Sequence, residues 1–222
     1  MTAIPLRITR LTAAYRRFLD DQHAPNFAAD VASSYQTTTL ISLLRRGDVH
    51  HRRASALALG LLGDRRCIEP LGRALSDPDR GVRIASDDSF RGLIHRDAAP
   101  VHHQKLLQLM HLSDGGDHAA VISPLLILID QAPMYAEAHH QLATAFMEVE
   151  QINEAELAYR ACLWRCRYHY LAWQGLSRCF LISGNTKRAA EALRRCVEIA
   201  PDHESARLQW SLIQRRTLDD PR

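Results

Sequence analysis

The residues of this sequence best suited to chemistry are two thiols and an imidazole, arranged as Cys162-x3-Cys166-x2-His169. This spacing places three side chains on one side of a helix end, and Cys and His are ligands that zinc accepts. A tetrahedral site needs a fourth ligand, which Cys179 or Cys196 would have to supply. Cys162 and Cys196, however, occupy equivalent positions of a tandem pattern, where small buried residues belong. We therefore interpret these thiols as core residues and predict no bound metal and no cofactor.

Histidine is abundant, with 12 residues in a chain of 222. Adjacent residues on a helix point in different directions, so a pair of neighbours does not form a chelating face. The chain also lacks a Gly-rich phosphate loop, a paired-carboxylate motif and a Ser/His/Asp or Cys/His combination. These observations predict a protein that is not an enzyme. The adjacent pairs are His50-His51, His102-His103 and His139-His140.

The composition is that of a folded protein with few loops, because 46% of residues are hydrophobic and only 10 Gly and 9 Pro are present. The length allows one large domain or two small ones. A net charge of +3 is too small to indicate nucleic acid or a membrane as partner. The 5 Cys have no regular spacing and suit a reducing cytoplasm. No apolar run approaches the ~18 residues of a membrane span, and no secretory signal is evident.

The elements that must position the candidate residues are helices repeated in tandem between residues 136 and 203. Five positions recur at one constant offset, and a fixed period of this length is typical of a solenoid of helical hairpins. Gly184 permits a tight turn between the two helices of the second unit. Glu150 stands at its equivalent in the first unit, and we expect a different turn there. The matched pairs are Leu142 and Leu176, Phe146 and Phe180, Ala155 and Ala189, Tyr159 and Leu193, and Cys162 and Cys196.

The pattern resembles the tetratricopeptide repeat, which implies an all-α fold and a role in binding other proteins. In that family the partner binds on the inner face of the first helix of each hairpin. The Lys and Asn clamp by which some members hold a C-terminal carboxylate is missing, so the resemblance implies an extended or helical peptide instead. Arg178 with Leu181 is our candidate anchor. The corresponding face consists of Glu137, His140, Gln141, Thr144, Met147, Glu148, Gln174, Arg178, Leu181 and Ile182.

A second, shorter period runs through residues 38–96. Residues 51–55 align with 82–86, and at the same offset Gly47-Asp48 aligns with Pro78-Asp79. The segment resembles HEAT repeats of the phycobilisome-lyase type, in residues 77–83 and 53–64 most clearly. Asp in the turn would cap the following helix. We expect Arg52 and Arg83 to form charge-assisted hydrogen bonds with an Asp of a neighbouring turn.

Together these patterns predict an all-α, right-handed α–α superhelix with HEAT-like repeats followed by tetratricopeptide repeats. The predicted parts are an N-terminal helix and cap at 1–37, HEAT-like repeats at 38–97, and tetratricopeptide repeats with a C-terminal capping helix at 98–222. A basic helix over 8–19 would cap the first repeat or, as an alternative, lie on a membrane. Pro124 either kinks its helix or follows Ser123 as the cap of a new one.

The leading functional hypothesis is a non-enzymatic cytoplasmic adaptor that binds another protein or a peptide. A nucleic-acid-binding HEAT solenoid, similar to some DNA glycosylases, is the first alternative. Nearby Asp residues and the lack of an aromatic cluster speak against it. The second alternative, a lyase-like chaperone for bilin attachment, depends on the HEAT subtype alone. The basic stripe that favours nucleic acid would contain Arg45, Arg46, Arg52, Arg53, Arg65, Arg66 and Arg80.

Overall fold

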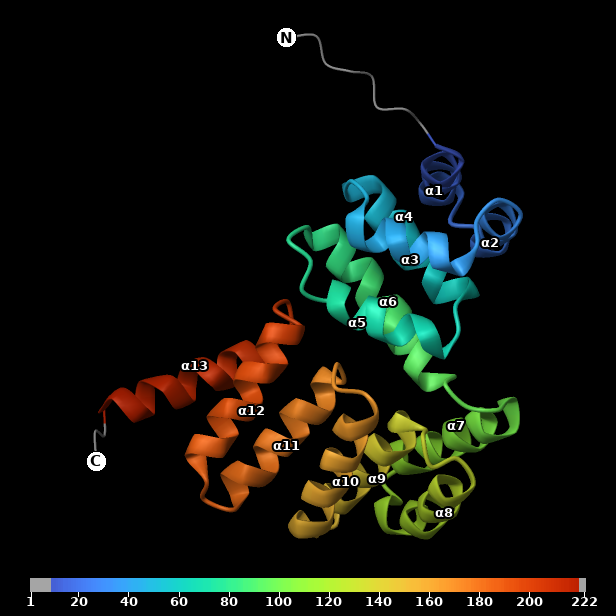
Figure 1. The fold of residues 1–222 in the computed structure, drawn as a ribbon. Coiled ribbons are helices and arrows are strands. Elements are labelled where there is room, and N and C mark those ends of the chain that lie inside the picture. Colours follow the sequence, from blue (N-terminus) through green and yellow to red (C-terminus); the bar gives the residue numbers. More distant parts are fainter. Residues whose placement is uncertain (1–8, 220–222) are drawn as a thin grey trace. The chain divides into compact units, whose positions relative to one another are not determined.

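The computed structural model describes residues 9–219, and this part of the chain is helical throughout, without a β-strand. The all-α prediction is therefore confirmed. The helices pack in neighbouring pairs within two compact units, Met1–Leu93 and Ile94–Arg222 (Figure 1). The division between the units falls inside one helix, α6 (Arg80–His95).

The first unit begins with two helices, α1 (Arg10–Asp21) and α2 (Ala24–Ala32), which both pack against α4 (Val49–Leu62). A capping box starts α1, because the backbone N–H of Thr12 donates to the side chain of Thr9 and the backbone N–H of Thr9 donates to the side chain of Thr12. The buried residues Leu11 and Phe27 form the core between these helices. The sequence predicted the first of these helices, although Ile8 at its predicted start lies outside the described residues.

The remainder of the first unit is made of α3 (Thr37–Arg46), α4, a short 3-10 helix (Arg65–Cys67), α5 (Ile68–Ala74) and α6. The predicted Asp caps are confirmed: Asp48 accepts a hydrogen bond from the backbone of His51 at 3.0 Å, and Asp79 from that of Val82 at 2.9 Å. At Gly60, α4 approaches α6 so closely that a Cβ would lie 2.9 Å from the Cα of Ser89. The two helices of neighbouring hairpins are thus in direct contact.

The second unit contains three helical hairpins and a last helix, in which each helix packs against the next. The tandem period correctly predicted its core, since Leu142, Ala155, Leu176, Phe180 and Cys196 are all buried. The helices are α7 (Pro100–Asp114) and α8 (His118–Gln131), α9 (Ala136–Glu148) and α10 (Ile152–Arg165), α11 (Tyr170–Ile182) and α12 (Thr186–Ile199), and α13 (Glu204–Asp219).

The turn between α9 and α10 does not differ from the next one in the way that the sequence predicted. Glu150 has φ +61°, in the same left-handed region as Gly184 at +74°, so the prediction of a different turn is wrong. Both turns close with the same bond, Gln151 N to Phe146 O at 2.9 Å and Asn185 N to Phe180 O at 2.7 Å. This bond satisfies a helix-end carbonyl, which offsets the ~1–2 kcal/mol cost of the left-handed conformation at Glu150.

Pro124 lies inside an unbroken α8, so no new helix starts there.

Candidate functional site

The first helices of the last two complete hairpins, α9 and α11, carry the ten predicted site residues. The structure divides these residues by exposure. Glu137 and Met147 are buried, so their side chains are covered by the fold. Met147 packs its sulfur 3.3 Å from the Sγ of Cys179. Half-buried are His140, Gln141, Thr144 and Gln174, and exposed are Glu148, Arg178, Leu181 and Ile182.

The four exposed residues lie near the C-terminal ends of the two helices. Arg178 and Glu148 form an ion pair between α11 and α9 with a separation of 3.4 Å, and their side chains are 62% and 37% exposed. Leu181 and Ile182 end α11 with 40% and 55% of their surface exposed. An exposed ion pair of this kind contributes little to stability. The arrangement therefore leaves two apolar side chains and a charged group open to solvent.

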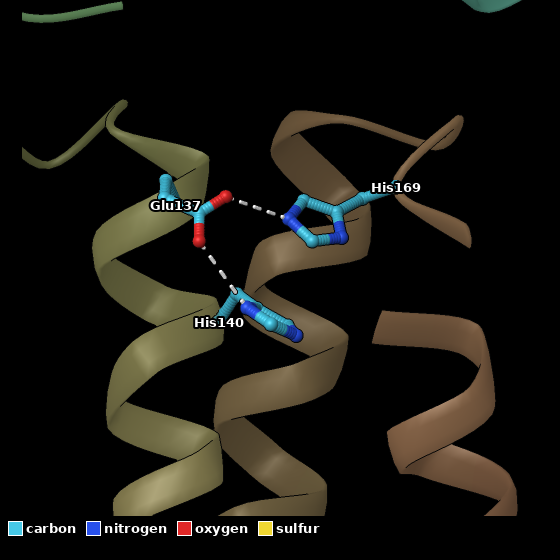
Figure 2. A group of neighbouring side chains, drawn as sticks. All are labelled: Glu137, His140 and His169. Atoms are coloured by element: carbon cyan, nitrogen blue, oxygen red, sulfur yellow. Dashed lines mark hydrogen bonds and ion pairs between the residues drawn. The ribbon is translucent and has the colours of Figure 1, made fainter. Parts of the chain in front are cut away.

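At the opposite end of α9 the structure assembles a buried cluster of Glu137, His140 and His169, called here the Glu–His–His cluster (Figure 2). Glu137 and His140 are three residues apart on α9, and His169 caps the start of α11. The Nε2 atom of His169 lies 3.0 Å from Oε2 of Glu137, and Nδ1 of His140 lies 3.4 Å from Oε1. Gln141 donates a further bond to Oε1 at 2.8 Å. One carboxylate thus accepts three hydrogen bonds from two repeats.

Burial controls the charges of this cluster. Burial alone would raise the pKa of Glu137, but hydrogen bonds from His140 and His169 outweigh it and hold that pKa well below its ordinary value. Burial, followed by the neighbouring His140, lowers the pKa of His169 despite its bond to the carboxylate. At neutral pH Glu137 is therefore ionised and His169 is neutral. The hydrogen-bond partners of the Glu137 carboxylate are neutral His169, the Gln141 amide and His140. The carboxylate is therefore a strong acceptor for a cation.

The second nitrogen of His169 fixes the position of its proton. Nδ1 accepts a hydrogen bond from the backbone N–H of Ala172 at 3.2 Å, which caps α11. A neutral ring with an acceptor at Nδ1 carries its proton on Nε2, so this nitrogen donates to Glu137. The tautomer is inferred from these two bonds. The cluster, as it stands, joins the α9 layer to the α11 layer by hydrogen bonds.

Spacing in the sequence groups His169 with Cys162 and Cys166, whereas the structure places it with Glu137 and His140. All five cysteines are buried, and none is part of a disulfide. Among the described residues, the Glu–His–His cluster is the one group of three or more His, Cys, Asp or Glu whose donor atoms converge, all within 4.8 Å. The sequence does contain part of this signal, because Glu137-x2-His140 places two ligands on one helix face.

In the first unit, the predicted bond of Arg52 to an Asp of a neighbouring turn is present. Arg52 binds Asp77 through two bonds of 2.8 and 2.9 Å. Arg53, for which no such bond was predicted, binds Asp79 through two bonds of 2.8 Å. Arg83 donates to the carbonyls of Asp77 and Pro78 in its own turn. With Arg66 paired to Asp64, three arginines of the basic stripe proposed for nucleic acid are thus paired with aspartate.

Comparison with known families agrees with this architecture. Residues 37–100 match the family model of HEAT repeats, and residues 170–203 match that of the tetratricopeptide repeat. These matches indicate a helical-repeat scaffold of the kind that takes part in protein–protein interaction, and both families are typically non-catalytic. More particularly, the protein combines HEAT repeats with a tetratricopeptide repeat in one chain. No curated protein matches it. Within residues 9–219, the structure contains no helix with the length and apolar character of a membrane span.

Proposed function

We infer that the protein binds a peptide segment of a partner protein along the concave face formed by α9 and α11. The observation that carries this proposal is the exposed group at the ends of these helices, Arg178 with Leu181 and Ile182. Leu181 and Ile182 still expose 40% and 55% of their surface, so covering them by a partner would contribute part of the ~1.5–3 kcal/mol of a fully buried aliphatic side chain. The two side chains would form the apolar centre of the interface.

Arg178 sets the polarity of the expected partner. Its bond to Glu148 is long, at 3.4 Å, and both side chains are more than a third exposed. A carboxylate of the partner can take the place of Glu148 at low cost, because exposed ion pairs are worth about 0–1 kcal/mol. The expected ligand is thus an extended or helical segment with apolar residues and an acidic one.

The N-terminal helices and the cysteines have supporting roles in this proposal. We regard residues 1–37 as a cap of the HEAT-like repeats at 38–97, which is supported by the packing of α1 and α2 against α4. The tetratricopeptide part, residues 98–222, provides the binding face. A cytoplasmic location accords with five buried cysteines, none of which is part of a disulfide.

Site-specific cross-linking tests the proposed face. A photoreactive amino acid at position 182 should capture a partner in the native host, whereas the same group at Leu157 should not. Leu157 is the matched control because it is 65% exposed on α10, outside the proposed face. The double variant Arg178→Ala/Leu181→Ala should then reduce recovery of that partner at least about tenfold, which is about 1.4 kcal/mol.

A second control separates a local effect from loss of the fold. The variant Leu157→Ala/Arg195→Ala removes an apolar and a basic side chain, 65% and 51% exposed, from α10 and α12. It should retain full recovery of the partner. Undiminished capture by the Arg178/Leu181 variant, with normal helicity in circular dichroism, would place the partner elsewhere and refute the proposal.

A further inference from the structure

We propose that the Glu–His–His cluster of Glu137, His140 and His169 binds a divalent transition-metal ion of the zinc class. The three side chains converge from α9 and from the residue before α11, and Figure 2 shows both imidazoles turned toward the carboxylate. Metal binding is distinct from partner binding at Leu181 and Ile182, because the two groups of residues lie at opposite ends of α9 and α11.

The spacing of the donor atoms suits a metal centre. Zinc binds imidazole nitrogen and carboxylate oxygen at about 2.0–2.2 Å, which places ligand atoms about 3–3.5 Å from one another. Glu137 already has its oxygens 3.0 Å from His169 Nε2 and 3.4 Å from His140 Nδ1. All three donor atoms lie within 4.8 Å of one another. A metal ion between them therefore requires only small side-chain movements.

The environment is prepared for a cation. The side chains of Glu137, His140 and His169 are 4%, 13% and 1% exposed. An ionised carboxylate in such a place is costly unless a positive charge accompanies it. Within the described residues no Arg or Lys forms an ion pair with Glu137; its partners are the two imidazoles and the Gln141 amide. A divalent ion would bring positive charge to this buried carboxylate.

The donor set selects the type of metal. Two imidazoles and one carboxylate suit Zn²⁺ and its first-row neighbours, whereas Ca²⁺ and Mg²⁺ require more oxygen ligands. Three protein ligands leave one position of a tetrahedral ion for water. His140 is the most exposed of the three residues, with 13% of its side chain accessible to solvent. The buried thiols of Cys162 and Cys166 are not required.

Metal binding has a local cost, which gives the proposal a specific signature. His169 must release the Nε2 proton and carry it on Nδ1, where the N–H of Ala172 now donates. This N–H does not lose its only acceptor, because it also bonds the carbonyl oxygen of His169 at 3.0 Å. The amide resonance of Ala172 should therefore shift when the metal binds, although Ala172 is not a ligand.

The next repeat provides an internal control. His203 stands one full repeat after His169, and its Nε2 faces Oε1 of Gln174 at 2.8 Å. Gln174 in turn is the equivalent of His140. The same histidine position thus exists in both repeats, but Leu171 stands where the first repeat has Glu137, and the partner of His203 is an amide. No metal should bind at the second position.

The test is a titration of the full chain, without a polyhistidine tag and after treatment with a chelator, with Co²⁺ and Zn²⁺. Wild-type protein should bind one Co²⁺ with visible d–d absorption, and Zn²⁺ should displace it. Glu137→Gln and His169→Asn should weaken Zn²⁺ binding at least about 100-fold. The Asn at position 169 keeps a side chain that caps helices well. His203→Gln should bind as the wild type does.

Two results would overturn the proposal. The first is wild-type protein that binds no stoichiometric metal. The second is binding that Glu137→Gln and His169→Asn reduce no more than His203→Gln does, because the metal would then occupy surface histidines or cysteines. Should Glu137→Gln fail to fold by circular dichroism, His169→Asn and the more exposed His140→Gln decide the question. Loss of metal with intact cross-linking at position 182 leaves the proposed partner face unaffected.

Discussion

The two units of this protein connect successive repeats with different chemistry. In the first unit, called here the HEAT unit after its match to HEAT repeats, the connection is ionic: Arg52 binds Asp77 and Arg53 binds Asp79, with side chains that are 11–34% exposed. In the second unit, called here the tetratricopeptide unit after its match at residues 170–203, the connection is buried. The side chains of Glu137 and His169 are at most 4% exposed there. Arginine keeps its charge at any ordinary pH, whereas imidazole can lose a proton or bind a metal.

This difference indicates where the chemical versatility of the chain lies. In a guanidinium–carboxylate pair the guanidinium has no lone pair with which it could bind a metal. The imidazoles of the tetratricopeptide unit have ring nitrogens that can donate, accept or coordinate. The proposed partner face and the proposed metal site both lie in the tetratricopeptide unit.

The largest effect is expected from removal of an ionic connection. Asp77→Ala leaves Arg52 without its two-bond partner and should lower the free energy of unfolding of the HEAT unit by about 3 kcal/mol. The rate of cysteine labelling reports the unfolding of each unit separately, because Cys67 lies in the HEAT unit and the other four buried cysteines lie in the second unit. Labelling of Cys67 alone should accelerate, by about 100-fold.

A matched control for Asp77→Ala is an exposed ion pair in the same unit. Arg17 and Asp30 are 61% and 49% exposed, so Arg17→Ala should change stability by less than about 0.5 kcal/mol. Equal acceleration of all five cysteines in Asp77→Ala would show that the two units unfold together. Equal effects of Asp77→Ala and Arg17→Ala would show that the buried geometry of the Arg52 pair contributes nothing.

Two close approaches, one in each unit, should give somewhat smaller effects. Gly60→Ala forces a Cβ to 2.9 Å from the backbone Cα of Ser89, so α4 and α6 must separate, at a cost of about 2–3 kcal/mol. Gly175→Ala meets the tip of the Tyr159 ring. A ring tip can move more readily than a backbone, so about 1–2 kcal/mol is expected there.

Urea unfolding distinguishes these two glycine variants. All three tryptophans, Trp164, Trp173 and Trp210, lie in the second unit and report on it alone. Gly175→Ala should lower the midpoint seen by Trp fluorescence. Gly60→Ala should lower the urea midpoint of the first unit, which circular dichroism detects and Trp fluorescence does not, and should leave the Trp midpoint unchanged. The reverse pattern would contradict the helix contacts on which the comparison of the units depends.

The sequence predicted those parts of the structure that depend on periodic burial. The longer and the shorter period placed the helices and core residues such as Leu142 and Cys196, because one buried face repeats along each helix. The Arg52–Asp77 bond was predictable as well, since turn and helix recur at one offset. The turn at Glu150 was not, because a hydrogen bond to Phe146 O stabilises a left-handed residue that sequence rules assign to Gly.

The Glu–His–His cluster marks the limit of sequence reasoning. His169 lies near Cys166 in the chain, but its partner Glu137 is 32 residues away. Which side chain of one repeat meets the next depends on the lateral packing of neighbouring hairpins, and a residue-spacing rule describes only one helix at a time. For the same reason Glu137 and Met147 are buried, although the sequence assigned them to the same helix face as the other predicted partner-binding residues.

The smallest predicted effect tests the ionic connection by pH. Hydrogen bonds from Arg53 lower the pKa of Asp79 to about 2 against burial, which raises it; the backbone N–H of Val82 adds to the lowering. The folded state thus favours the ionised form, and the resulting stability is present above the unfolded pKa of 3.8. It is lost as the pH falls from about 3.8 to about 2. Solvent screening of this partly exposed pair reduces the contribution to about 1 kcal/mol.

Asp79→Asn isolates this charge, because asparagine retains the cap of α6 that Asp79 provides through Val82. Urea midpoints of the HEAT unit, from circular dichroism, should differ between wild type and variant by a constant amount from pH 7 to pH 4.5. Below pH 4 the two should converge, while the Trp midpoint of the second unit remains the same in both proteins. A difference that is undiminished at pH 2 would mean that the Arg53–Asp79 charge pair does not stabilise this unit, and that its Arg–Asp connections act through geometry alone.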